Sequence, residues 1–176
     1  MNKEEIKKLV QDILEEAILI VYKEDRDVLT NKVIERCVCA RLAHHLENLM
    51  RQYDDVFHGY YADVEYDRMA NADPKHIVGE KKHVCDLLIH SRGHKETDNL
   101  LALEMKVHDH NSNVECDICR LKHIVQHSNE QTTGYVRDTL IGVFLRMQEQ
   151  QYKYRLFDGD VNDGEPSEEI TIPIQL

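Results

Sequence analysis

Residues 99–108, NLLALEMKVH, form an apolar run that is interrupted by two charged residues, Glu104 and Lys106. The run predicts a β-strand, and alternate side chains of a strand point to opposite faces of its sheet. Glu104 and Lys106 therefore share one face. The other face carries Leu101, Leu103, Met105 and Val107. Because an unpaired buried charge is costly, two interpretations are open: this face is solvated, or its charged residues form a functional site.

A second strand with an acidic residue precedes this one. Residues 84–90 read VCDLLIH and contain Asp86, and the polar residues 91–98 predict a hairpin connection to the strand that follows. Antiparallel pairing through this hairpin would place Asp86 across from Glu104 and Lys106. Mg²⁺ commonly takes one or two carboxylates, water and phosphate oxygens, and a nearby lysine can assist the attacking water. The pattern fits metal-assisted phosphodiester hydrolysis.

The rest of the chain predicts a single α/β domain spanning residues 1–176. Apolar residues at helical spacing predict amphipathic helices, whereas short apolar runs predict further strands. Helices are expected at 3–23, about 30–52 and about 114–128, and strands at 61–67, 84–90, 99–107, 139–145, 152–157 and 170–174, with a loop at 69–82. This order predicts a mixed central sheet that is flanked by helices.

Charge and cysteine content limit the function. The formal net charge of −11 disfavours a general polyanion-binding surface, which needs clustered Lys and Arg. Residues 1–8 are strongly charged, and the apolar run at 17–22 is too short for a secretory signal or a membrane span. Five cysteines without an export signal indicate reduced thiols. We therefore expect a cytoplasmic protein without a membrane segment.

The spacing of Asp86 and Glu104-Met105-Lys106 resembles the signature of the PD-(D/E)xK nuclease superfamily. Residues 34–44, IERCVCARLAH, are similar to the helix that supplies an additional glutamate in many members, matched here by Glu35. Residues 62–68 resemble the first core strand of small bacterial members. The resemblance covers about residues 30–147, with the helix at 3–23 and the strands at 152–174 outside it. Where these proteins often have a proline before the aspartate, this chain has Cys85.

The resemblance implies a restriction-endonuclease-like core of a helix, three antiparallel strands, a helix and a strand. It also implies a Mg²⁺- or Mn²⁺-dependent DNA endonuclease, acting as a homodimer because one site cuts one strand. Asp86, Glu104 and the backbone carbonyl of Met105 would bind the metal. Lys106 would serve the attacking water or the scissile phosphate, and Glu35 would add a further carboxylate.

Other charged residues could have a structural role instead of a role in the site. Glu35 could instead be a surface charge paired with Lys32 or Arg36. Asp63, Glu65 and Asp67 share one strand face. We favour its interpretation as the solvated face of an edge strand over a role in supporting a metal ion. Candidate phosphate contacts, or otherwise solvated helix faces, are Arg120, Lys122 and His123, together with Arg41, His44 and His45.

Zinc is a second metal to consider. His108, His110, Cys116 and Cys119 are residue types that bind zinc, but the two pairs leave little chain to close a structural site. Two alternatives to a nuclease remain: a nuclease-fold binding or assembly module that does not cut, and a zinc-stabilised interaction protein. Cys37 and Cys39 lie on opposite sides of a predicted helix, so one is expected in the core and neither in a disulfide.

Overall fold

The computed structural model describes residues 1–66, 84–95, 99–108, 113–127, 140–160 and 164–174. Within these residues the centre is a six-stranded sheet whose strands follow one another in chain order. The strands are β1 (Tyr61–Val64), β2 (Leu87–His90), β3 (Asn99–Val107), β4 (Ile141–Met147), β5 (Gln151–Asp158) and β6 (Ile170–Pro173). β3 and β4 are parallel and the other neighbours are antiparallel. The expected mixed α/β fold is confirmed.

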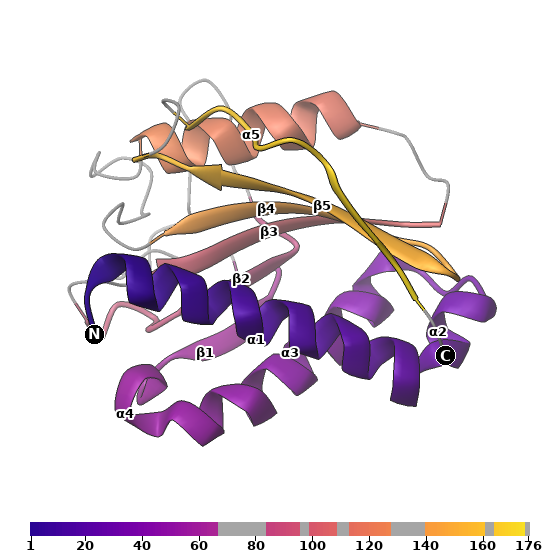
Figure 1. Ribbon diagram of the computed structural model, residues 1–176, viewed down its shortest axis with the longest axis horizontal. Helices are drawn as coiled ribbons and strands as arrows, with labels where there is room; N and C mark the ends of the chain where they lie inside the picture. The colour runs from indigo at the N-terminus through magenta and orange to yellow at the C-terminus, as the bar shows by residue number, and fades with distance from the viewer. Residues whose placement is uncertain (67–83, 96–98, 109–112, 128–139, 161–163, 175–176) are drawn as a thin grey trace.

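Helices cover both faces of the sheet. α1 and α3 lie on one face and α5 on the other (Figure 1). The helices are α1 (Lys3–Glu24), α2 (Arg26–Thr30), α3 (Glu35–Met50), the 3₁₀ turn η1 (Arg51–Tyr53), α4 (Asp54–Phe57) and α5 (Val114–His127). α5 is the crossover that a parallel pair such as β3 and β4 requires. Among the described helices, none has the length and apolar character needed to cross a membrane.

The two faces of β3 belong to different layers. As expected, its apolar side chains at alternate positions pack in one core with α1 and α3: Leu101, Leu103, Met105 and Val107. Ala102, on the opposite face, packs in the core beneath α5. Gly142 of β4 lets α5 approach closely, because a Cβ at this position would lie 3.2 Å from Val125 Cγ1. Glu104 and Lys106 therefore face the α5 side of the sheet.

Several predicted boundaries were wrong. The helix expected at about 30–52 begins only at Glu35, because Lys32 adopts φ 51° ahead of it, and the short helix α2 was not predicted. The strand expected at 61–67 ends at Val64, since Glu65 also has φ 51°. β2 begins at Leu87, so Asp86 precedes the strand instead of lying within it. β4 extends two residues beyond the predicted end at 145. The loop expected at 69–82 lies outside the described residues.

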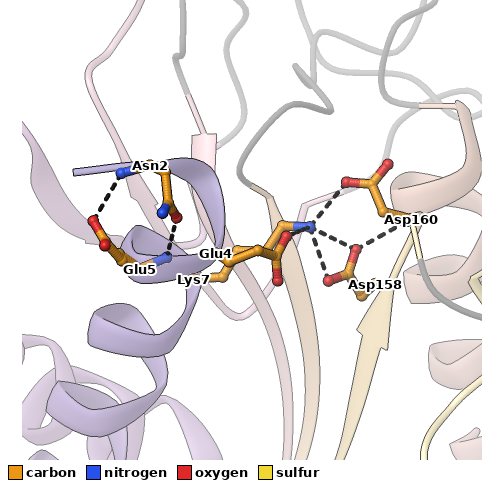
Figure 2. A network of polar contacts seen from close by, with 6 residues as sticks. All are labelled: Asn2, Glu4, Glu5, Lys7, Asp158 and Asp160. Carbon is orange, nitrogen blue, oxygen red and sulfur yellow. Dashed lines mark hydrogen bonds and ion pairs between the residues drawn. The ribbon is translucent and has the colours of Figure 1, made fainter.

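The buried side chain of Lys7, in α1, is paired with two aspartates at the C-terminal end of β5 and just beyond it. Lys7 Nζ donates hydrogen bonds to Asp158 Oδ1 at 2.8 Å and to Asp160 Oδ2 at 2.9 Å (Figure 2). Burial alone would lower the pKa of Lys7, but the two aspartates outweigh it and the pKa is raised. At the start of the same helix, Asn2 and Glu5 form a reciprocal capping box (Figure 2).

We expect Lys7→Met to lower the free energy of unfolding by about 1–2 kcal/mol at neutral pH, because it leaves two neighbouring aspartates without their shared cation. Chemical denaturation of the two proteins measures the difference. Lys8→Met is the matched control, since Lys8 pairs with Asp12 on the exposed side of the same helix. Equal effects of the two substitutions would contradict a special role for the buried lysine.

Candidate active site

Pairing of β2 with β3 brings Asp86 to Glu104. Leu87 pairs with Leu103 in antiparallel register. Asp86, one residue before Leu87, therefore lies opposite Glu104, one residue after Leu103. Asp86 Oδ2 accepts a hydrogen bond of 2.7 Å from the backbone N–H of Met105. The Asp86 and Glu104 carboxyl groups lie close enough to affect each other's pKa. The predicted convergence of these two groups is confirmed.

Both carboxyl groups bind protons unusually tightly. Burial raises the pKa of Asp86 to about 7 and repulsion from Glu104 adds to the rise, while the Met105 N–H and Lys106 oppose it. Burial likewise raises the pKa of Glu104 to about 7, with Arg120 opposing the rise and Asp117 adding to it. Ionisation of both facing carboxyl groups is unfavourable because the two charges repel each other with little water between them, and a cation between them would remove this repulsion.

Lys106 lies beside this pair and is buried. Its Nζ lies 2.9 Å from Asp117 Oδ2 and 3.5 Å from Glu35 Oε1, and it donates a hydrogen bond of 3.1 Å to the Met105 carbonyl oxygen. Glu104 is only 2% exposed and Lys106 9%. The interpretation of this strand face as merely solvated is therefore wrong.

Glu35, the first residue of α3, reaches the same cluster. Its carboxylate contacts Lys106, whereas Arg36, one of the surface partners considered for it, instead binds both carboxylate oxygens of Glu65. Burial raises the pKa of Glu35, Lys106 opposes the rise and Asp86 adds to it. The structure thus brings together all four side chains that the sequence predicted: Glu35, Asp86, Glu104 and Lys106.

Asp117 is a member of the cluster that sequence reasoning missed. It lies in the first turn of α5, is 2% exposed, and contacts both Lys106 and Arg120. Arg120 Nε in turn lies 3.7 Å from Glu104 Oε1. A signal was present, because Asp117 stands four residues before Leu121 and seven before Ile124, on the buried stripe of its helix.

The candidate phosphate-binding residues do not lie together in the structure. Arg120 lies at the cluster, whereas Lys122 forms an ion pair with Glu165. Arg41 Nε lies 2.8 Å from Asp25 Oδ1, at the junction of α1 and α2. His45, 5% exposed, contacts the other oxygen of the same Asp25 carboxylate. Arg41 and Lys122 are thus held by carboxylates away from the site.

The acidic residues of β1 are held by basic side chains. Asp63 accepts two hydrogen bonds of 2.7 Å from Arg92 and lies 3.0 Å from His90 Nε2. Glu65 is held by Arg36. β1 is the edge of the sheet, as the favoured interpretation required. Asp67 lies outside the described residues.

The proposed zinc ligands are not gathered in the part of the chain that the structure describes. Cys116 and Cys119 are exposed free thiols on α5, His108 follows the end of β3, and His110 lies outside the described residues. Among the described residues, no group of three or more His, Cys, Asp or Glu side chains is arranged to hold a metal ion. Cys37 is exposed and Cys39 buried, as predicted, and both are free thiols.

The charge of the cluster suits one divalent cation. Four carboxyl groups, those of Glu35, Asp86, Glu104 and Asp117, accompany the two cations Lys106 and Arg120, which leaves a net charge of −2 when all are ionised. Mg²⁺ needs only one or two protein carboxylates, the rest of its ligands being water and substrate. The facing Asp86 and Glu104 carboxyl groups, both with raised pKa values, therefore fit such an ion.

Comparison of the chain with known protein families, with curated proteins and with solved structures gives no match. Its function must therefore be inferred from the site itself. The decisive features are the paired carboxyl groups, the buried lysine beside them and a second, partly buried cation, Arg120.

Proposed function

We propose that this chain is a Mg²⁺- or Mn²⁺-dependent DNA endonuclease of the PD-(D/E)xK type. The observation that carries the proposal is the pair of facing carboxyl groups, those of partly buried Asp86 and buried Glu104, with the Lys106 ammonium beside them. The element order adds support, because a helix that bears Glu35 precedes three antiparallel strands, and a second helix connects these to a parallel strand. This is the order of a restriction-endonuclease-like core.

Asp86, Glu104 and the backbone carbonyl of Met105 would hold the metal ion, and Glu35 would supply a further carboxylate. When bound, the ion would polarise the phosphodiester and lower the pKa of an attacking water. The cluster carries the negative charge that such an ion needs. The Met105 carbonyl oxygen lies within the cluster, since it accepts a hydrogen bond of 3.1 Å from Lys106 Nζ.

The cationic side chains would act on the substrate. The Lys106 ammonium would orient the water for attack or stabilise the charge that develops on the phosphate. Arg120, beside Glu104, would contact a phosphate oxygen. Cleavage of both strands of a duplex would require two copies of this site, and therefore a homodimer.

The test is cleavage of supercoiled plasmid and of single-stranded DNA with Mg²⁺ or Mn²⁺. We expect the wild-type protein to cut in the presence of either ion, and both EDTA and Lys106→Ala to abolish cutting. Lys153→Ala, which removes an ion-paired lysine from β5, is the control and should retain activity. Equal cleavage by the wild type and Lys106→Ala would place the activity elsewhere.

The second candidate is a nuclease-fold binding or assembly module that does not cut. The occupied basic side chains favour it, because Arg41 and Lys122 are paired with carboxylates in a chain of net charge −11. Stabilisation by Mg²⁺ or Mn²⁺ without cleavage of either DNA substrate would support this function over the endonuclease.

A further inference from the structure

We propose that Asp117 is a positioning residue that keeps the Lys106 ammonium from displacing the metal ion. The inference rests on the proposed function of the cluster. Asp117 comes from α5, whereas the expected ligands come from α3 and from the β2–β3 region. It therefore holds the lysine from outside the ligand set.

The distances around Lys106 carry the inference. Its Nζ is nearest to Asp117 Oδ2, at 2.9 Å, then to the Met105 carbonyl oxygen at 3.1 Å and to Glu35 Oε1 at 3.5 Å. The two more distant partners are oxygens that would serve the metal. The ammonium thus lies within contact of metal ligands, while its closest partner is a carboxylate outside that set.

The position of Asp117 is restrained by its hydrogen bonds and by its burial. Its backbone N–H donates a hydrogen bond of 2.9 Å to the Asn113 carbonyl oxygen, and its side chain is 2% exposed. Its other carboxylate oxygen contacts Arg120. This carboxylate is therefore a buried anion paired with two cations, and it opposes movement of Lys106 toward the ligands.

Loss of this anion would change the partners of Lys106. The ammonium would be left with Glu35 and the Met105 carbonyl, where its charge repels a divalent cation and occupies the same oxygens. Asp117→Asn should therefore weaken metal binding through Lys106. Removal of the ammonium should then restore binding.

The experiment is calorimetric titration of the full chain with Mn²⁺ in the absence of DNA. We expect Asp117→Asn to bind Mn²⁺ about tenfold more weakly than the wild type. Lys106→Met should bind like the wild type, and the Asp117→Asn/Lys106→Met double variant like Lys106→Met alone. Glu115→Gln is the matched control, because it removes the same charge from the exposed side of the same helical turn.

Asp117→Glu provides a second test that does not depend on how well the asparagine variant folds. It keeps the charge but moves the carboxylate one methylene farther, which displaces the ammonium toward the ligands. We expect weaker Mn²⁺ binding, whereas an effect of charge alone predicts no change. Unchanged binding by Asp117→Glu therefore overturns the inference.

The outcomes separate this inference from the proposed function. If Asp117→Asn weakens Mn²⁺ binding equally with Lys106 present or replaced, its charge acts directly and the positioning role is refuted, while the metal site stands. If the wild type binds no Mn²⁺, both the metal site and the positioning role are refuted.

Discussion

Glu104→Gln is expected to lower DNA cleavage by about 10³-fold or more while stabilising the metal-free protein. The loss of activity follows from removal of one of the two facing carboxylates that would hold the metal ion. Glutamine has nearly the same shape, so the strand and the core beneath it should remain intact.

The gain in stability has a separate cause. Glu104 is 2% exposed, and burial raises its pKa to about 7 despite the opposing charge of Arg120. Above neutral pH this group is ionised in the folded, metal-free protein, where its buried charge is less favourable than that of the same carboxylate exposed in the unfolded chain. A neutral amide avoids that cost, and we expect a gain in the free energy of unfolding of roughly 1–3 kcal/mol at pH 8.

Plasmid cleavage and urea denaturation in EDTA measure the two effects of Glu104→Gln. Glu47→Gln is the control, since Glu47 pairs with Arg51 at the surface of α3. It should retain both activity and stability. A Glu104→Gln protein that is less stable than the wild type in EDTA at pH 8 would show that the carboxylate stabilises the metal-free fold, contrary to this account.

Divalent cations are expected to stabilise the wild type much more at pH 7.5 than at pH 5.5. Folding raises the pKa of Asp86 from an ordinary 3.8, and that of Glu104 from 4.5, to about 7 in each case. The folded protein thus holds protons that the unfolded chain has lost, so the contribution of these two groups to metal-free stability is complete below about pH 4 and decreases as the pH rises to about 7.

Metal binding has the opposite pH dependence, because the ion must displace these protons at low pH and meets ionised carboxylates at high pH. We expect the difference in Mg²⁺ stabilisation between the two pH values to be on the order of 2–3 kcal/mol at saturating ion. Thermal unfolding with and without Mg²⁺ measures it. Asp86→Asn should lose most of the stabilisation, and equal stabilisation of the wild type at both pH values would argue against this carboxyl pair as the metal site.

The sequence was most informative where side-chain periodicity and burial agree. Alternation in β3 correctly assigned Leu103 and Met105 to one core and Glu104 to the opposite face. The hairpin connection then sufficed to place Asp86 opposite Glu104. Both inferences use only the period of a strand and the pairing of neighbours.

The missed features depend on contacts between distant segments. No side chain caps the start of α3, where Ile34 is the N-cap, so local sequence does not mark the break before Glu35. Asp117 resembled an ordinary acidic residue of a helix N-terminus. Its position on the buried stripe of the helix marked it as buried, but its contact with Lys106 depends on α5 crossing over the sheet.

The position of α1 has a consequence for biosynthesis. Lys7 finds its partner Asp158 only 151 residues later in the chain, and the Tyr22 hydroxyl donates to the carbonyl oxygens of Gln148 and Gln151. Both contacts, near opposite ends of α1, can form only after β5 has been synthesised. The native packing of α1 on the sheet must therefore wait for β5, and the nascent helix must meanwhile leave its apolar side uncovered by the sheet.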